Sequence, residues 1–460
     1  MVTGTEIEFA PCEGETVVIR GFGPLRPEHA ETSIAEATRD PRIRPARRPA
    51  RAVIMGLSYA PSGRRSTPVF RLRASYRGAV GLAVRAVGSI EDVPREAWDA
   101  LAGDAPPFVR WGWIHALEAS GSATKKTGWE PRHLTAWRGT TLVGVAPVWK
   151  KTHSYGEYIY DFGWASAAQE MGIAYYPKLL VGVPLGPISA PRFLAAPGDD
   201  EARGALVQGA LDLVKTERCS SLHVIFPTES EADALERGGF SRRTGMQYHW
   251  KNPGYATYDD YLARFASKRR TQIKRERGAA EKQGIRIATV RGDAIQPIHA
   301  DRAWSFYEAT AGGRGWGHVQ LTQDFFRRIF ETFRSEVELV EATKDGRVIA
   351  GAFNVASGGR LYGRYWGCFE EHPFLHFHVC LYHSIDECIR LGRTVFEPGA
   401  GGEHKIARGF APSPVHSAHR MFDPRLDRAV RDFVKREREH LAPVFEQGEE
   451  IAGMRPYERP

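Results

Sequence analysis

Cysteine and long apolar runs are scarce in this chain of 460 residues. The five cysteines fit neither zinc-binding nor redox spacing, and their odd number argues against a disulfide framework. No run of 18 or more apolar residues occurs, which excludes a membrane-spanning helix. The opening residues lack the basic and then apolar order of a secretory signal. We therefore expect a cytoplasmic protein, with attachment to the periphery of the inner membrane as the alternative.

What is present is typical of a globular protein with anionic partners. Hydrophobic residues make up 42% of the chain, charged residues 26%, and there are 11 tryptophans, a balance found in soluble folded domains. The length allows about two to three domains. The net charge of +8 and the pI near 9.2 favour nucleic acid, phosphorylated substrates or an acidic lipid surface as partners.

The order of expected elements divides the chain. Residues 1–80 are rich in arginine and proline and show little hydrophobic periodicity, so we expect a disordered extension. Residues 82–252 alternate strands and helices around a hairpin at residues 138–140. Residues 255–442 form a second domain, and 443–460 a tail. The predicted fold class is α/β (α+β), with mixed sheets flanked by helices.

One stretch, directly after a short strand at 394–396, concentrates reactive groups. Three glycines follow Pro398, and glycine lets the backbone approach a ligand closely: Gly399, Gly401 and Gly402. Next come an acid, an imidazole, an amine and a guanidinium: Glu403, His404, Lys405 and Arg408. These groups suit proton transfer or anion binding. A solvated turn with scattered charges is the alternative.

Two further segments carry candidate site residues. The first lies at a strand boundary beside a glycine and has an imidazole and two carboxylates: His153, Glu157 and Asp161. The second is a predicted strand, residues 360–369, with a guanidinium among aromatic rings: Arg364, Tyr362 and Trp366. In both segments the aromatic residues are equally compatible with a packed core.

The most basic helix of the folded region is predicted over residues 258–284. Between Lys268 and Arg277 it has Glu276 as its only acid. One interpretation is a face that binds phosphate or a charged carrier, and the other is a solvated helix. The cations of the binding face are Lys268, Arg269, Arg270 and Lys274.

Three histidines lie close together in the sequence: His376, His378 and His383. We expect a strand that ends near Cys380 and leads into a helix over residues 381–391. No carboxylate completes a ligand set around these imidazoles, so we assign them to packing. We expect no bound metal and no bound cofactor.

Several blocks of the sequence resemble known acyltransferases. The segments SKRRTQIKRERGAAEKQGIRI, LYGRYWGCF and LHFHVCLYHSIDECIRLGRTVFEPGAGG resemble the second domain of the FemABX peptidyltransferases, which are tandem GNAT proteins. The blocks HSYGEYIYDFGWA and FEPGAGGEHKIARGFAP are similar to the FemAB-like family of peptidoglycan biosynthesis and recognition. The resemblance covers residues 82 to 440 and leaves the first 80 residues outside.

The resemblance implies two GNAT-like domains that face each other and catalyse amide formation. In such a reaction an amine attacks an activated acyl group on a thioester or an aminoacyl ester, which requires a deprotonated amine and a stabilised oxyanion. Glu403 or His404 is then the candidate base, and Lys405 and Arg408 contact the oxyanion or a phosphate. The three glycines offer backbone N–H groups, and residues 153–161 line the same cleft.

The donor and the acceptor stay open at this stage. The phosphate-cradling signature of GNAT enzymes that use CoA is not present in clean form, whereas a basic helix suits an aminoacyl-tRNA. Acyl-CoA and an acyl carrier protein are the other donors. One alternative function is fatty-acyl transfer to a long-chain amine, as in ceramide-type N-acylation at an anionic membrane. Another is a non-catalytic binder of cell-wall precursors.

Overall fold

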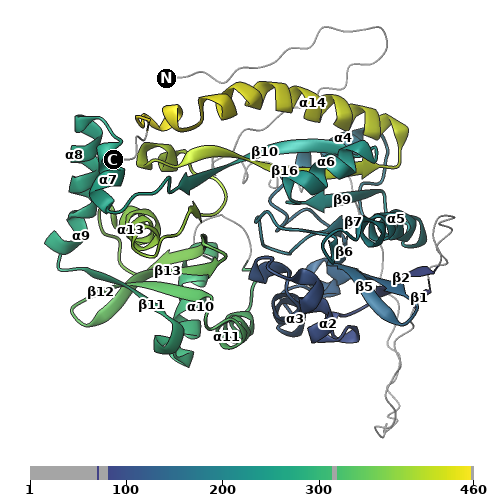
Figure 1. Cartoon of the computed structure of the whole chain (residues 1–460), viewed down its shortest axis with the longest axis horizontal. Coiled ribbons are helices and arrows are strands. Elements are labelled where there is room, and N and C mark those ends of the chain that lie inside the picture. The colour runs from purple at the N-terminus through teal and green to yellow at the C-terminus, as the bar shows by residue number, and fades with distance from the viewer. Residues whose placement is uncertain (1–69, 72–80, 313–318, 457–460) are drawn as a thin grey trace, which may run out of the picture.

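The computed structural model describes residues 70–71, 81–312 and 319–456. Most of the predicted extension (1–69 and 72–80), residues 313–318 and the end of the predicted tail (457–460) lie outside the described residues. The described part has two lobes, joined across the top of Figure 1 by two long strands and one long helix. The mixed α/β fold class predicted from the sequence is confirmed.

The strands form two sheets. The smaller sheet belongs to the N-terminal lobe and has the order β1-β2-β4-β5-β8: β1 (Phe70–Arg71), β2 (Leu82–Val87), β4 (His133–Arg138), β5 (Thr141–Ala146) and β8 (Leu194–Ala195). The larger sheet runs through both lobes in the order β11-β12-β13-β14-β15-β10-β16-β9-β7-β6-β3: β3 (Trp129–Pro131), β6 (Val148–Lys151), β7 (Lys178–Val181), β9 (Ser221–Ile225), β10 (Ser241–Lys251), β11 (Arg286–Arg291), β12 (Val337–Lys344), β13 (Arg347–Ser357), β14 (Arg360–Cys368), β15 (Val395–Glu397) and β16 (Ala411–Met421).

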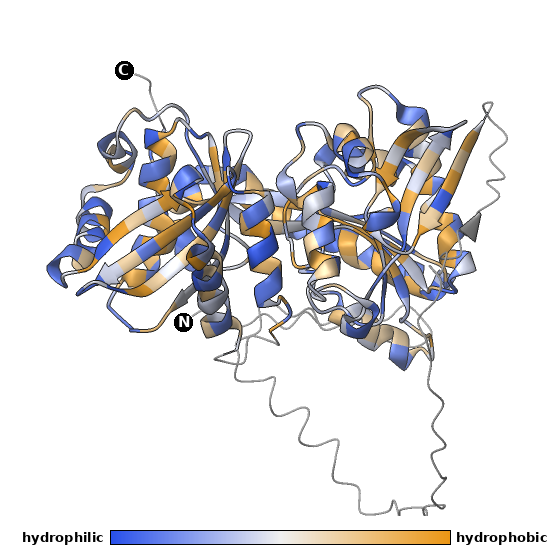
Figure 2. Ribbon diagram, turned by 90° about the horizontal axis from the view of Figure 1, so that it is seen from below, coloured by the Kyte–Doolittle hydropathy of each residue, from blue (hydrophilic) through white to orange (hydrophobic). Residues whose placement is uncertain are grey.

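Helices cover these sheets. Those of the N-terminal lobe are α2 (Arg95–Ala102), α3 (Trp111–Ala119), α4 (Phe162–Glu170), α5 (Asp200–Thr216) and α6 (Glu229–Arg237). The C-terminal lobe carries α7 (Tyr258–Ala263), α8 (Ser267–Arg277), α9 (Ala279–Lys282), α10 (Pro297–Ala311), α11 (Gln323–Thr332), α12 (Leu375–Phe377), the π-helical turn η6 (His378–Tyr382) and α13 (His383–Arg390). The last long helix, α14 (Pro424–Gln447), lies along β10 and β16 (Figure 1). Hydrophobic residues concentrate along the strands of both lobes, and hydrophilic ones at outer helices and turns (Figure 2).

The C-terminal strand β16 lies in the sheet of the N-terminal lobe. It pairs with β10 from Ala411↔His249 to His419↔Ser241 and, on its other edge, with β9. The sequence did not predict this strand, because Pro412 and Pro414 lack the N–H that a central strand donates. The regions predicted as 82–252 and 255–442 therefore exchange a strand, and they share one continuous sheet.

The two lobes also share an apolar core. Helix α3 packs against α11, where the ring of Trp113 makes an edge contact with Phe325 at 5.6 Å between centroids. Gly112 permits this approach, because a Cβ there would lie 2.7 Å from Thr332 Cγ2. Burying apolar surface stabilises at roughly 25 cal/mol per Å². This contact therefore helps to fix the two lobes relative to each other.

Two predicted elements of the C-terminal lobe are wrong in detail. The single basic helix expected over 258–284 is three helices, α7, α8 and α9, because the chain is extended at Ala266 and a turn at Gly278 separates α8 from α9. The strand expected to end near Cys380 is helical, from α12 through η6. Apolar residues recur there every three or four positions and are buried, a helical period: Leu375, Val379, Tyr382, Ile385 and Ile389.

Candidate functional site

The site begins where two parallel strands separate. β14 and β15 pair over three positions, from Arg360↔Val395 to Tyr362↔Glu397. Beyond these three pairs β14 continues, whereas the segment that follows β15 turns at Pro398. Gly363 allows the last close approach, because a Cβ there would lie 3.1 Å from the Cα of Pro398. The predicted glycine-rich stretch therefore follows the point where the pairing of β14 and β15 ends, and we refer to this point as the opening between the two strands.

Lys405 lies behind this opening, in the short 3-10 helix η7 (Glu403–Arg408). Gly402 and Gly409 bound η7 with positive φ angles of 91° and 76°, which favour glycine. The Lys405 amine is 6% exposed and donates to the Gly399 carbonyl over 2.8 Å. Burial lowers its pKa to about 8. This amine is therefore close to its titration point at neutral pH.

Imidazoles and aromatic rings pack against one another around His404, the residue before Lys405. The His404 ring centroid lies 5.7 Å from that of His376 and 5.4 Å from that of Phe377. Trp366 packs on His376 at 4.8 Å. Burial, helped by nearby cations, lowers the pKa of both histidines to about 4. Both imidazoles are thus neutral at pH 7, and the lowered pKa makes each a weaker proton acceptor than an ordinary histidine.

Arg408 holds η7 in place. Its guanidinium donates to the Glu276 carboxylate of α8 and to the His404 carbonyl, each over 2.7 Å. It also lies 3.4 Å over the Phe377 ring. Glu276 balances the charge of Arg408. The predicted contact of the Arg408 guanidinium with an oxyanion or a phosphate therefore stays a prediction. Glu403, the other end of the cluster, is exposed to solvent.

A buried acid and a histidine that the sequence did not reveal lie on the neighbouring strands β15 and β10. Glu397 ends β15, is 5% exposed and forms an ion pair with Arg360. Burial raises the pKa of this carboxyl. His249 of β10 has Nε2 4.0 Å from Glu397 Oε2, and burial lowers its pKa to about 3. The sequence signal was weak, because Glu397 and His249 belong to different strands and lie 148 residues apart.

Arg364 and the aromatic residues of β14 connect the opening to the N-terminal lobe. The Arg364 guanidinium donates to the Leu185 carbonyl over 2.6 Å, and the Tyr365 hydroxyl donates to the same oxygen over 3.2 Å. Tyr362 is buried against Phe108, with ring centroids 5.2 Å apart. Tyr362 therefore packs in the core, and Arg364 joins the lobes.

The three predicted residues of the N-terminal lobe surround a buried lysine or lie beside it. Lys178 donates to Glu157 over 2.7 Å and forms an ion pair with Asp161, and all three side chains are 0% exposed. Burial raises the pKa of Glu157 to about 7, and Lys178 holds the pKa of Asp161 well below its usual range. His153 is half-buried, with Nε2 3.0 Å from the Thr127 carbonyl. Glu157 and Asp161 are therefore enclosed rather than exposed to a cleft.

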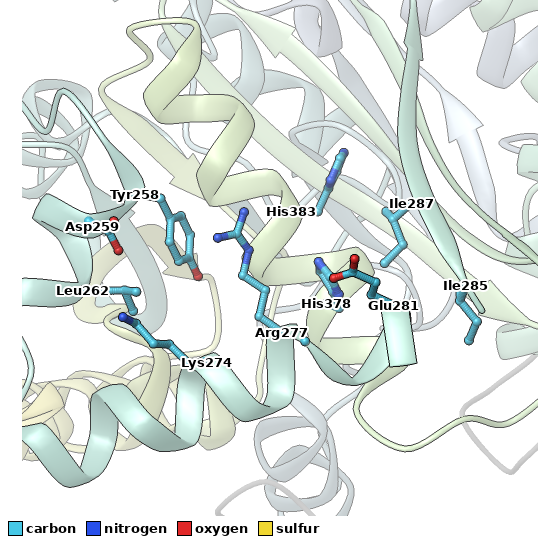
Figure 3. Close-up of a pocket in the computed structure, with 11 residues that line it drawn as sticks. Tyr258, Asp259, Leu262, Lys274, Arg277, Glu281, Ile285, Ile287, His378 and His383 are labelled. Carbon is cyan, nitrogen blue, oxygen red and sulfur yellow. The ribbon is translucent and has the colours of Figure 1, made fainter. Parts of the chain in front are cut away.

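The predicted carrier-binding cations lie along α8. Lys268 and Lys274 are exposed. Arg269 donates to Gln272 over 3.0 Å, and Arg270 to the Phe265 carbonyl over 2.9 Å. Lys274 also lines a hollow beside α8 (Figure 3).

Two observations on the described ranges concern metal ligands and membrane-spanning helices. Within them, no group of three or more histidine, cysteine, aspartate or glutamate side chains is placed to hold a metal ion. No helix in the same part of the chain combines the length and the apolarity that crossing a membrane demands.

Comparison with known families identifies the class. A model of the FemAB-like family, described as peptidoglycan biosynthesis/recognition, matches residues 89–459. The match covers well over half of the chain, so the chain belongs to the FemAB-like family. This membership confirms the resemblance seen in the sequence and supports the predicted N-acyltransferase class. No match was found among curated proteins.

Solved structures with related folds are distant in sequence. The crystal structure of FemX is 14% identical, with a TM-score of 0.47, and the match covers 74% of this chain and 98% of that one. L-PGS from Bacillus licheniformis is 9% identical, with a TM-score of 0.42, over 76% of this chain and 98% of its own. A tandem GNAT protein from the clavulanic acid biosynthesis pathway is 12% identical, with a TM-score of 0.36, over 75% and 99%.

Proposed function

We propose that this protein is an amide-forming N-acyltransferase that transfers an acyl or aminoacyl group to an amine in cell-envelope biosynthesis. The observation that carries the proposal is the Lys405 amine, buried with a pKa near 8 behind the opening between β14 and β15. Family membership supports the reaction class. In this proposal residues 82–252 and 255–442 derive from two GNAT-like units.

The reaction joins an amine nitrogen to a carbonyl carbon. As the C–N bond forms, the C–O or C–S bond to the carrier breaks, and the proton lost by the amine passes to the departing oxygen or sulfur. Lys405, charged below pH 8, stabilises the negative charge that develops on the carbonyl oxygen. The N–H groups of Gly401 and Gly402 assist it. His404, neutral at pH 7, or Glu403 accepts the proton from the amine.

Glu397 is a third candidate for the base. Its buried carboxyl has a raised pKa, a property that catalytic carboxyl groups share. Its ion pair with Arg360 argues for a positioning role instead. The two roles differ in the expected effect of Glu397→Gln, which lowers turnover and shifts the pH profile only if the carboxyl moves the proton.

The donor that we favour is an aminoacyl-tRNA. The exposed amines of Lys268 and Lys274 on α8 are available to contact phosphates. Acyl-CoA and an acyl carrier protein are the donors to compare with it.

The test is incubation of the purified full chain with each labelled donor and a panel of amines that includes peptidoglycan precursors and long-chain amines. Mass spectrometry of the products would reveal the amide. The proposal predicts product with one donor class and its loss in Lys405→Met. Absence of any amide across the panel would overturn it.

Binding without turnover would instead favour a recognition protein, the other half of the family description. Glu403→Gln and His404→Ala separate the two, because they remove proton transfer and leave the contacts of Lys405 intact. Loss of turnover with ligand affinity retained supports catalysis, whereas loss of affinity alone supports recognition.

A further inference from the structure

A hollow of about 500 Å³ lies beside helix α8 in the C-terminal lobe (Figure 3). Helices α7, α8 and α9 form one wall, and β11 with η6 and α13 forms the other. A volume of this size is within the range of small-molecule sites. Its lining residues are Tyr258, Asp259, Leu262, Lys274, Arg277, Gly278, Glu281, Ile285, Ile287, His378 and His383.

Two polar atoms in this lining are buried without a partner. The Tyr258 side chain belongs to a residue that is 8% exposed, and its hydroxyl has no hydrogen-bond partner within the described ranges. His378 Nδ1 is also buried and has no hydrogen-bond partner within the described ranges. Proteins seldom bury polar groups without hydrogen bonds, because each such group loses its hydrogen bonds to water on folding and this costs free energy. Figure 3 shows the Tyr258 hydroxyl directed toward the space beside Lys274 and Arg277.

Opposite charges are balanced around the hollow. Lys274 and Arg277 supply two cations, and Asp259 and Glu281 supply two carboxylates. Arg277 also forms an ion pair with Asp386, just outside the lining. In Figure 3 the Lys274 amine and the Tyr258 hydroxyl lie on one side, and the Glu281 carboxylate lies on the other, beside His378. Asp259 lies on the same side as Lys274 (Figure 3), so that side offers a cation, a carboxylate and a hydroxyl, and the other side offers the Glu281 carboxylate.

The two histidines add hydrogen bonds without charge. Burial, with Arg277 nearby, lowers the pKa of both His378 and His383 to about 4, so each ring is neutral at pH 7. His383 Nε2 lies 2.8 Å from the Thr289 hydroxyl, which holds that ring. Ile285 and Ile287 complete the wall with apolar surface.

We propose that this hollow binds a small zwitterion, a free α-amino acid, in addition to the substrates of the transfer reaction. The ligand carboxylate meets Lys274 and the Tyr258 hydroxyl, and its ammonium group meets Glu281. Its side chain lies on Ile285 and Ile287. A singly charged ligand would leave one end of this lining unpaired.

The site is connected to the candidate active site through shared elements. Glu276, one residue before Arg277, holds Arg408 of η7. Phe377, one residue before His378, carries the Arg408 guanidinium on its ring. An amino acid in the hollow therefore contacts the elements that position Lys405, from their other side.

The experiment is calorimetric titration of the purified full chain with L-serine, L-alanine, L-leucine, L-lysine and L-glutamate. The N-acetyl and carboxamide forms of each acid test the two ends separately. We expect saturable binding of at least one amino acid, weakened about tenfold or more when either end is blocked. Equal affinity for the blocked and the free forms overturns the proposal, and so does the absence of any binding. Saturation of the site by inorganic phosphate alone, with no amino acid bound, also overturns it.

Variants locate the binding. Lys274→Met and Glu281→Gln remove exposed charges, so folding is retained, and each is expected to weaken binding about tenfold or more. Lys282→Met, an exposed neighbour outside the lining, is the matched control. Lys405→Met is expected to leave the affinity unchanged. If it abolishes binding instead, the amino acid occupies the proposed active site, and the hollow is not the site.

Discussion

Arg408 and Glu276 form a buried ion pair between η7 and α8, with NH2 and Oε2 2.7 Å apart and side chains 7% and 3% exposed. The same Glu276 carboxylate accepts a hydrogen bond from the Tyr382 hydroxyl over 2.5 Å. The turn that carries His404 and Lys405 is therefore held by a carboxylate 132 residues away.

Removing one partner of this pair is expected to destabilise the protein strongly. Arg408→Met leaves Glu276 buried without its counter-ion, a change that typically costs about 3–5 kcal/mol. The free energy of unfolding in urea, measured at pH 7.5, checks this. The double variant Arg408→Met, Glu276→Leu should recover part of the loss, because no charge is left unpaired. Additive losses would contradict a coupled pair.

Lys405 is expected to control the rate of amide formation. Lys405→Met removes the proposed oxyanion partner, so kcat/KM should fall about 100-fold or more. Above pH 8 the wild-type rate should decline, because the amine with a pKa of about 8 loses its charge there. Lys405→Arg should extend the active range to higher pH. Lys435→Met, an exposed lysine of α14, serves as the control and should match wild type.

Acid should destabilise the fold through buried neutral histidines. His223 and His419 pair across β9 and β16, Nδ1 to Nδ1 at 2.8 Å. Burial lowers the pKa of His223 to about 3 and that of His419 well below its usual value. The unfolded chain then binds more protons than the folded chain below pH 6.5. Stability is thus full above pH 6.5 and should fall by at least about 2 kcal/mol toward pH 4.

Urea unfolding between pH 7.5 and 4 measures this loss, and the double variant His223→Gln, His419→Gln should reduce its slope. Glu157 acts in the opposite direction, since its folded pKa of about 7 is above the unfolded value. Its contribution is lost as the pH rises through 7. Glu157→Gln should therefore steepen the loss in acid, and an unchanged slope in both variants would contradict these assignments.

Gly367 is required by the packing of β14 on α10. A Cβ at this position would lie 2.1 Å from the Phe306 carbonyl oxygen, which is backbone and unable to swing aside. Gly367→Ala should therefore destabilise by about 1–3 kcal/mol or more. Gly204→Ala in α5 is the matched control, because its Cβ meets nothing within 4 Å. That variant should stabilise by roughly 0.5–1 kcal/mol in thermal or urea unfolding.

Much of the fold could be predicted from local patterns. The hairpin at 138–140 forms as β4 and β5, and α6 begins at a local signal, the Thr228–Glu231 capping box. These elements depend on neighbours in the sequence, so composition and spacing suffice. β16 was missed, because its prolines oppose a strand and only its partners β9 and β10 hold it extended.

The candidate site was predicted in part. The glycine turn with Lys405 does follow a short strand, β15, whereas the role of this turn and a carrier face on α8 stay predictions. Glu397 and His249 could not be found, since a carboxylate and an imidazole meet only after β10 and β15 pair. The expectation that residues 153–161 line the same cleft stays untested, with Glu157 and Asp161 enclosed around Lys178.

The sequence by itself determined many of the element types and placed reactive groups after a glycine turn, because hydrophobic period, capping and glycine act over a few residues. The tertiary structure decided which charged side chains are paired and buried and which remain free to contact a substrate. Arg408 and Glu276, or Lys178 and Asp161, become partners only when distant segments pack together. Pairing and burial then shift the protonation of each group, and neither can be read from the chain in isolation.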